Sequence, residues 1–497
     1  MSAREAYLGI DLGTTAVKAA LVEGETGCLI AGAGRRISTT VHAHGEREQR
    51  PGEILGAVGS VIAELRKQAG GKWRNVAGVS LASQGGSAVI ARRETGEALT
   101  EMWPWNDARP FAYMHKVEKK LGRAFWRRHT MRDDGGAGLG RMLWLRQTRP
   151  EVVTTRNIYA GAGEFVFYQL TGVWRQDAGS ALQVGCYDAR KRTLMREPLD
   201  AVGVPETFVA AMREGHETAP MTREAAKRFG LAEGTPVAGP YMDHEAGFMA
   251  AAGISPRPLQ CSLGTAWVGN FLMKRSAKWS NPFQLVIPSP IDDGWQVVQP
   301  MLTGNVTWEW GLAAFVHGDR KKALAGAARM LDEATPGGGV VCVPWLGRPN
   351  PFCEGAFGAG AFVGVNPATT HADMLKALAA GMAFEFYRVF EEVHRKRIVD
   401  SLVLGGGAAG AEFFRKMFAA LFAPVPVYVF EDHEYAGARG AVRPFDAKAG
   451  KAAVRAVGRP GVRFAAEALR AYEDYRRVFE RLYGDVGCAG PARVEAR

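Results

Sequence analysis

The stretch YLGIDLGTT, Tyr7–Thr15, joins a short apolar segment to a turn rich in glycine and threonine. Two further glycine-rich turns follow apolar segments later in the chain, SLGTA at Ser262–Ala266 and GGGAAG at Gly405–Gly410. Glycine lets backbone N–H groups approach phosphate oxygens, and threonine hydroxyls add further donors. The carboxylate of Asp11 suits a phosphate site if Mg²⁺ separates the two negative groups. The turns together indicate an ATP-dependent phosphotransferase whose site is assembled from two domains.

The segments around these turns have the periodicities of strands and helices. Short strands are expected at Tyr7–Ile10, Val17–Val22, Cys28–Ala31 and Val76–Leu81. Amphipathic helices are expected at Ile54–Gln68 and Asp373–Val393. A strand, a glycine turn and a second strand recur at Gln260–Met273, which is a weak internal duplication. This mixture of strands and helices predicts an α/β architecture.

The C-terminal part is helical and basic by its sequence. An aromatic and aliphatic stripe runs through Phe464–Tyr483 and includes Phe464, Leu469, Tyr472 and Phe479. Such a stripe is typical of a docking face, so it predicts packing on the body of the protein or a dimer contact.

The length of 497 residues is too great for a single hydrophobic core, so two or more domains are expected. No apolar run is long enough to span a bilayer, and Met1–Ala6 does not begin a secretory signal. The six cysteines form no Cys-x-x-Cys pair, which argues against a zinc site or a disulfide framework. We therefore expect a cytoplasmic protein without a membrane partner.

The net charge of +11 has two interpretations. It could serve nucleic-acid binding or the attraction of anionic substrates, or it could reflect general arginine enrichment. The basic residues are spread along the chain, with no RNA-recognition or zinc-finger signature. The sequence therefore predicts no nucleic-acid partner and leaves room for electrostatic steering of a nucleotide.

The GGGAAG turn also matches Gly-x-Gly-x-x-Gly after a strand, which is typical of dinucleotide-binding dehydrogenases. In those enzymes the motif opens a repeated βαβ domain, whereas here it lies late in the chain. A dehydrogenase would also leave Asp11, Thr14 and Thr265 unexplained. A P-loop is not indicated, because the chain has no Gly-x-x-x-x-Gly-Lys-Ser/Thr.

Two further segments suit a hydroxyl-bearing acceptor. In Trp105–Arg109, hydrogen-bonding side chains stand beside an indole that could cover the C–H face of a sugar. The alternative for this segment is an ordinary polar turn. Asp243 stands at the start of an expected helix, where it could accept a proton from a hydroxyl or simply cap the helix.

Taken together, these pieces resemble the FGGY family of carbohydrate kinases, nearest to its xylulokinase-like members, from Tyr7 to about Ala441. The resemblance implies an α/β fold of two ribonuclease-H-like lobes, of the actin, hexokinase and Hsp70 type, with an interlobe cleft. It implies domains at residues 1–240 and 241–445, followed by a helical basic tail at 446–497. Dimers are common in this family, so a homodimer is compatible with the resemblance.

The resemblance also implies a role for each matching residue. Asp243 would be the catalytic base, and Asp11 would meet Mg²⁺ directly or through water. The residues implied for ATP are Asp11, Gly13, Thr14, Thr15, Gly264, Thr265, Gly406 and Gly407. The residues implied for the sugar are Gln84, Trp105, Asn106, Asp107, Arg109 and Asp243.

One sugar-side segment departs from the family pattern. The usual Gly-Gln-Met-His-Gly reads SQGGS at Ser83–Ser87, so Met and His are replaced by glycines. A ketopentose, a polyol and a sugar acid therefore all stay open as acceptors.

The sequence thus predicts an ATP-dependent kinase of a small sugar or polyol, with a xylulose-like ketose favoured and with ATP and Mg²⁺ as cofactors. The alternative is a catalytically degenerate, actin-like protein that binds ATP and acts as a regulator. Sugar-dependent release of ADP would separate the two.

Overall fold

The computed structural model describes residues 5–483 except 133–134, 265, 275–283, 302, 317, 333–335, 337–338, 347–359 and 452. The chain forms two compact units. The first comprises Met1–Ile254, Leu285–Gln296 and Tyr435–Ala452, and the second comprises Ser255–Gln284, Val297–Glu434 and Ala453–Arg497. The units are therefore interleaved along the sequence, whereas the expected domains at 1–240 and 241–445 are continuous segments.

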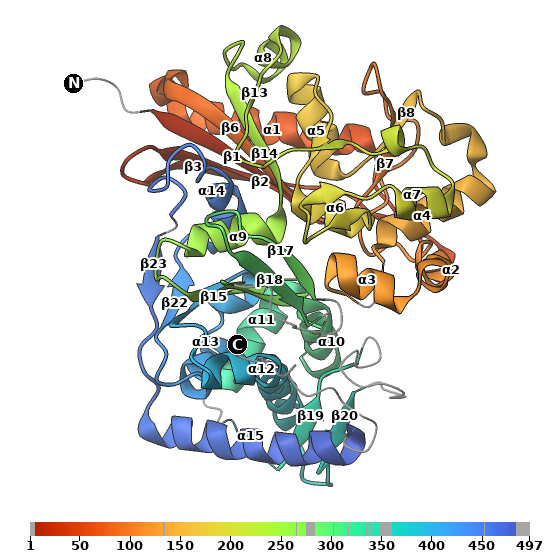
Figure 1. The fold of residues 1–497 in the computed structure, drawn as a ribbon. Coiled ribbons are helices and arrows are strands. Elements are labelled where there is room, and N and C mark those ends of the chain that lie inside the picture. Colours follow the sequence, from red (N-terminus) through yellow and green to blue (C-terminus); the bar gives the residue numbers. More distant parts are fainter. Residues whose placement is uncertain are drawn as a thin grey trace. The chain divides into compact units, whose positions relative to one another are not determined.

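The first unit is built on a six-stranded sheet with the order β13-β14-β6-β1-β2-β3 (Figure 1). Its strands are β1 (Ala6–Leu12), β2 (Ala16–Glu23), β3 (Leu29–Arg36), β6 (Val76–Ser83), β13 (Ala219–Pro220) and β14 (Pro236–Met242). β2 pairs antiparallel with β1 and β3, whereas β6 pairs parallel with β1 and β14. The strands predicted from Tyr7 to Leu81 are confirmed, because strong apolar runs bounded by glycine turns encode them.

Helices cover both faces of this sheet. α1 (Pro51–Ala69) buries Ile54, Val58 and Leu65 against one face, as its helical periodicity predicts. α14 (Ala436–Ala441) packs on the other face, where a Cβ at Gly9 would collide with the Ala438 carbonyl oxygen. α9 (Asp243–Ala251) packs in turn against α14.

The chain between β6 and β14 adds a second core beside the sheet. This core contains the pair β7 (Val89–Arg92) and β8 (Asn157–Ala160) and residues of the helices α2 (Phe111–Leu121), α3 (Arg123–Thr130), α4 (Ala137–Thr148), α6 (Ala178–Val184) and α7 (Glu197–Val202). Two further helices of the same stretch, α5 (Ala162–Thr171) and α8 (Arg223–Phe229), pack in the core of the sheet instead.

The sheet of the second unit repeats the pattern of the first. The strands of this sheet run in the order β17-β18-β16-β15-β21-β22-β23. They are β15 (Pro258–Leu263), β16 (Trp267–Met273), β17 (Leu285–Pro288), β18 (Trp295–Pro300), β21 (Ser401–Gly405), β22 (Val427–Phe430) and β23 (Val454–Ala456). β15 pairs antiparallel with β16 and parallel with β21, and β21 pairs parallel with β22. In the first unit, β1 likewise pairs antiparallel with β2 and parallel with β6, and β6 pairs parallel with β14. The internal duplication expected from the sequence is therefore confirmed.

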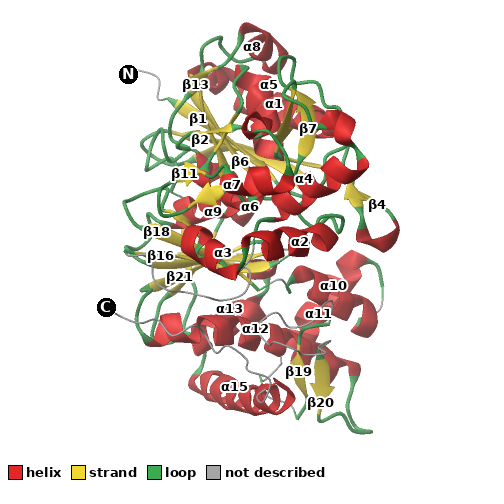
Figure 2. Ribbon diagram, turned by 45° about the vertical axis from the view of Figure 1, so that its right-hand side comes forward, coloured by secondary structure: helices red, strands yellow, loops and turns green. Residues whose placement is uncertain are grey.

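The second unit also contains helices, which Figure 2 shows in red. They are α10 (Asn305–Phe315), α11 (Arg320–Asp332), α12 (His371–Arg395), α13 (Glu412–Leu421) and α15 (Val462–Tyr483). A capping box of Thr370 and Asp373 begins α12, and the helix lies where its strong periodicity predicts.

The C-terminal helix α15 packs on the body of the second unit. Tyr472 and Phe479 are buried there, and the Tyr475 hydroxyl donates to Glu385 Oε2 at 2.6 Å. Leu469, which was expected on the same stripe, is 46% exposed, because the buried face of α15 includes Ala468 and Ala471 instead. Across the part of the chain that the structure describes, no helix combines the length and apolar character needed to cross a membrane.

Candidate functional site

Two carboxylates meet at one edge of the first sheet. β1, β6 and β14 are parallel, so their carboxyl ends share that edge. The register pairs Leu12 with Ser83 and Ser83 with Met242. Asp11 and Asp243 therefore come together although 232 positions separate them in the sequence.

The electrostatics of Asp11 follow from this arrangement. Burial raises its pKa to about 7, with the nearby Asp243 carboxylate acting in the same direction and Lys18 in the opposite one. Its Oδ1 atom is buried and has no hydrogen-bond partner among the described residues. Burying a carboxylate oxygen without a hydrogen-bond donor costs free energy, and such an oxygen is a suitable ligand for a hard divalent cation. The position therefore fits the Mg²⁺ expected from the sequence.

Asp243 is the first helical residue of α9, while Met242 occupies the N-cap position. Glu245 Oε2 accepts the Met242 N–H at 3.0 Å, so Glu245 does the capping. The alternative of Asp243 as an ordinary N-cap is therefore wrong. Its Oδ1 accepts the N–H of His244 at 2.9 Å, and its side chain is 33% exposed, so it stays accessible to an acceptor.

The first glycine-threonine turn is tied to the expected sugar segment. Trp105 Nε1 donates to Thr14 Oγ1 at 3.0 Å, and Gln49 Nε2 donates to the Thr14 carbonyl oxygen at 2.7 Å. Gln84 Nε2 reaches Gln49 Oε1 at 3.4 Å, while Gln84 Oε1 is buried without a partner in the described structure. Gly13 begins this turn, with its N–H donating to the Ala16 carbonyl oxygen at 3.1 Å. The structure thus brings together residues that sequence patterns assigned separately to phosphate and sugar.

Thr15 and Asn106 complete this part of the site. Thr15 is exposed at the same turn, and its carbonyl oxygen accepts the Ile37 N–H at 3.1 Å. Asn106 is half-buried, and its Oδ1 atom has no hydrogen-bond partner within the described parts of the chain. The unpartnered amide oxygen can accept from a ligand donor.

Asp107 and Arg109 belong to a buried ion network. Asp107 is fully buried and accepts from Arg109 Nε at 2.9 Å and from the Arg47 N–H at 3.0 Å. Arg109 Nη1 also reaches Glu48 Oε1 at 2.7 Å, and these contacts hold the pKa of the Glu48 carboxyl below its usual range despite its burial. Arg141 Nε lies 4.0 Å from Asp107 Oδ2. The network fixes the turn that presents Trp105 and Asn106.

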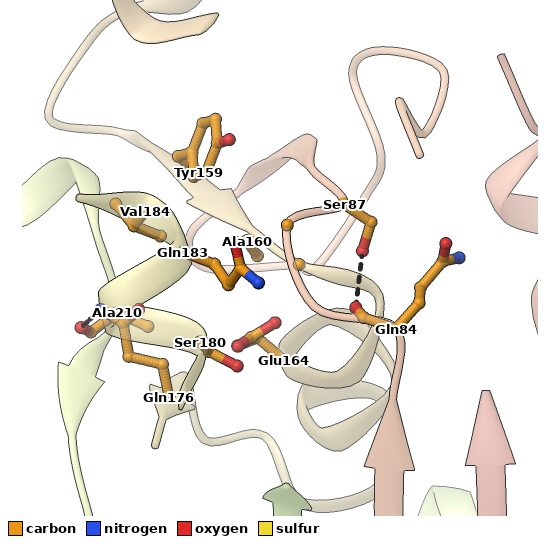
Figure 3. Close-up of a pocket in the computed structure, with 12 residues that line it drawn as sticks. Gln84, Ser87, Tyr159, Ala160, Glu164, Gln176, Ser180, Gln183, Val184 and Ala210 are labelled. Carbon is orange, nitrogen blue, oxygen red and sulfur yellow. Dashed lines mark hydrogen bonds between the residues drawn. The ribbon is translucent and has the colours of Figure 1, made fainter. Parts of the chain in front are cut away.

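A small polar cavity lies beside these residues in the first unit (Figure 3). Its volume is about 20 Å³, which is room for about one water molecule. Its lining includes Gln84, Gly86, Ser87, Glu164 and Gln183. Burial raises the pKa of Glu164 to about 7. Sequence patterns missed Glu164 and Gln183, because each stands in a helix without a recognisable motif.

The second unit brings the other two glycine turns together. Ser262 pairs with Gly405 at the ends of β15 and β21. Gly406 has φ +84°, and a Cβ there would lie 3.0 Å from the Gly264 nitrogen. Gly407 follows directly and starts a short 3₁₀ turn. Thr265 lies outside the described residues.

Asn305, at the start of α10, is a neighbour of these turns that sequence patterns missed. Its N–H donates to the Gly264 carbonyl oxygen at 3.1 Å, and its Oδ1 accepts from Trp267 Nε1 at 3.3 Å. The Gly304-Asn305 pair at a helix start is the one signal in the sequence that could have indicated it.

Comparison with known proteins identifies the family. The model of the N-terminal domain of the FGGY family of carbohydrate kinases matches residues 6–250, and the model of its C-terminal domain matches residues 259–443. Together these matches cover most of the chain.

Relatives and solved structures agree with this match. The chain is similar to a xylulose kinase of Staphylococcus epidermidis, with 23% identity over 84% of this chain and 83% of the relative. It is similar to a gluconokinase of Bacillus subtilis, with 23% identity over 84% of this chain and 82% of the relative. The solved xylulose kinase of Rhodospirillum rubrum superposes with a TM-score of 0.83 at 20% identity, over 97% of this chain and 100% of that one, and shares its fold. The chain therefore belongs to the FGGY family of carbohydrate kinases, and it is a sugar kinase with the two-domain fold of the actin and hexokinase type.

Proposed function

We propose that this enzyme transfers the γ-phosphoryl group of ATP to a hydroxyl of a small sugar or polyol, with Asp243 as the general base. The observation that carries the proposal is the meeting of Asp11 and Asp243 at one sheet edge of the first unit. A hydroxyl is a weak nucleophile, so a carboxylate that accepts its proton assists the attack of its oxygen on phosphorus. Asp243 is accessible, in contrast to the buried Asp107.

Sugar contacts are proposed for Gln84, Trp105 and Asn106. Gln84 Oε1 and Asn106 Oδ1 have no donor in the described structure, and the half-buried Trp105 directly precedes Asn106 in the chain. Asp107 and Arg109 support this segment through their ion network. Since the relatives include a xylulose kinase, a xylulose-like ketose is the favoured acceptor.

Asp11 is the proposed ligand of Mg²⁺, directly or through water, because its buried oxygen lacks a donor among the described residues. When bound, Mg²⁺ neutralises phosphate charge. The residues proposed for ATP are Gly13, Thr14 and Thr15 in the first unit and Gly264, Thr265, Gly406 and Gly407 in the second.

The test is a coupled assay of ADP release with Mg·ATP against ketoses, polyols and aldonic acids. One acceptor is expected to stimulate release, and Asp243→Asn is expected to lower turnover by about 10²- to 10⁴-fold. Near-normal turnover in a folded Asp243→Asn protein would refute the general-base role. Nucleotide binding without release stimulated by any acceptor would instead favour an ATP-binding regulator.

A further inference from the structure

Two glycines leave one side of the candidate sugar site without side chains. Gly85 and Gly86 follow β6, and both are partly accessible. A Cβ at Gly85 would lie 3.4 Å from Gln183 Cγ, and a Cβ at Gly86 would lie 3.6 Å from Gln183 Oε1. The side-chain amide of Gln183 therefore faces Gly86, whereas at Gly85 its aliphatic part and Met242 already lie close to the Cβ position.

Gln183 lies beside Met242, the residue before the candidate base, and close to the indole segment. A Cβ at Gly85 would also lie 3.1 Å from Met242 Sδ, and Met242 directly precedes Asp243. A Cβ at Gly86 would lie 3.4 Å from Trp105 Cβ. Figure 3 shows the Gln183 side chain extending into the cavity from the end of α6. A group bound beside Gly86 and Trp105 thus comes within reach of this amide.

The amide has hydrogen-bonding capacity to spare. Within the described residues, its polar contact is Nε2 to the Met242 thioether at 4.0 Å, and sulfur is a weak acceptor. Gln176, which also lines the cavity, differs because its Nε2 donates to the Ala210 carbonyl oxygen at 2.6 Å. Gln176 therefore serves the fold, whereas Gln183 can both donate to and accept from a ligand.

The surrounding charges favour a neutral ligand group. Glu164 lines the same cavity, and because burial raises its pKa to about 7, a second carboxylate would be repelled by its ionised form, whereas a hydroxyl can hydrogen-bond to either protonation state. The nearby Arg141 guanidinium is already engaged, since Nη1 donates to the Gly86 carbonyl oxygen at 3.1 Å and to the Tyr159 hydroxyl at 2.9 Å. Its charge also faces Asp107 at 4.0 Å. A hydroxyl, which donates and accepts, suits Gln183 better than a carboxylate does.

We propose that Gln183 is a specificity-determining residue whose amide hydrogen-bonds a hydroxyl of a neutral ketose or polyol in the space beside Gly86. This inference rests on the proposed function and narrows its acceptor to uncharged compounds. It assigns the recognition of one acceptor hydroxyl to α6, apart from the Trp105 segment.

Gln183→Leu tests the proposal, because leucine fills a similar volume without the amide. Binding of ketopentoses, pentitols and aldonates is measured by calorimetry, and kcat and KM are measured for each acceptor. Loss of one hydrogen bond predicts about a tenfold weaker Kd and higher KM for the preferred neutral acceptor. The value of kcat is expected to change less than about threefold, because binding of ground and transition states weakens alike.

Gln68→Ala is the matched control, since Gln68 is exposed on α1 and bonds Glu64 at 3.1 Å. An unchanged Kd in Gln183→Leu overturns the inference, as does a wild-type protein that binds aldonates and no neutral acceptor. Measuring binding and turnover separately distinguishes failure of the proposed function from failure of the inference about Gln183. If neutral sugars bind without stimulating ADP release, the proposed function fails, while the effect of Gln183→Leu on Kd still decides the role of Gln183.

Discussion

Individual residues at the sheet edge have environments that sequence motifs do not reveal. The motif predicted Asp11 in a phosphate turn, and the register of β1, β6 and β14 adds that it lies beside Asp243. The Trp105–Arg109 segment predicted a row of sugar contacts, but its Asp107 is fully buried in an ion network. A motif specifies residue types, whereas burial depends on partners such as Glu48 and Arg141 that lie elsewhere in the chain.

The raised pKa of Asp11 predicts a pH-dependent stability. Without a cation its pKa is about 7 in the folded protein against an ordinary value of 3.8. The folded state then keeps a proton that the unfolded state releases between about pH 4 and pH 7, so stability from this group is lost as pH rises. Asp11→Asn cannot ionise, so its unfolding temperature without Mg²⁺ is expected to exceed that of wild type by about 3 °C at pH 8.

Thermal unfolding in metal-free buffer from pH 4 to pH 8 checks this expectation. The two proteins should unfold at similar temperatures near pH 4, where both side chains are neutral. Addition of Mg·ATP at pH 8 should stabilise the wild type more than the variant. Parallel curves across the whole range would mean that Asp11 titrates normally.

Asp107 supports the sugar segment through buried contacts, and this predicts a stability effect. Asp107→Ala removes an acceptor from Arg109 and leaves a buried guanidinium less well paired. Breaking a buried ion pair costs about 3 kcal/mol, so a clear drop in the unfolding temperature is expected. Asn106→Ala is the neighbouring control, since Asn106 Oδ1 has no donor to lose in the described structure. Equal stability of the two variants would contradict a supporting role for Asp107.

At the scale of elements, α9 is positioned by a pair of buried carboxyl groups. Glu245 on α9 and Asp177 at the N-cap of α6 are each 4% exposed and share a side-chain hydrogen bond. Two carboxylates can hydrogen-bond only through a shared proton. Burial first and then Asp177 raise the pKa of Glu245 well above its usual range. The proton thus ties the start of α9, which carries Asp243, to the helix that carries Gln183.

Two substitutions of Glu245 test this contact, because glutamine keeps its hydrogen bonds and alanine removes them. Glu245→Gln keeps a donor for Asp177 and an acceptor for the Met242 N–H, so folding and kcat should stay close to wild type. Glu245→Ala leaves both partners unsatisfied and is expected to cost about 2 kcal/mol of stability. The unfolding temperature and kcat of both variants show whether these hydrogen bonds position α9. Identical behaviour of the two variants would show that this contact does not position α9.

The main elements could be predicted from the sequence where one periodicity dominates. β1, β2, α1 and α12 have uninterrupted apolar patterns, and each lies where its pattern predicts. The face of α15 was only partly predicted, because Ala468 and Ala471 carry its contacts and alanine gives a weak periodic signal. The Asp177 to Glu245 contact was beyond sequence reasoning, since neither helix has a motif that indicates the other.

At the scale of the whole molecule, the chain returns to its first unit after completing much of the second. Tyr435–Ala452 belongs to the first unit, where α14 covers β1 and packs on α9. Backbones approach so closely there that a Cβ at Gly440 would collide with the Ala246 carbonyl oxygen. Contacts between positions so distant in sequence leave no periodic trace, so the continuous domains expected from the sequence did not include this return.

This return predicts that residues 1–254 do not form a stable domain alone. The isolated segment would expose the sheet face that carries Tyr7, Ala20 and Val22, because Ala438 and Val442 pack against these residues in the full chain. In the full-length protein, Gly440→Ala should loosen the same contact and lower the unfolding temperature of the first unit. Gly410→Ala is the matched control, because a Cβ there meets no atom within 4 Å. Cooperative thermal unfolding of the 1–254 fragment, or equal stability of the two alanine variants, would show that the first unit is complete without α14.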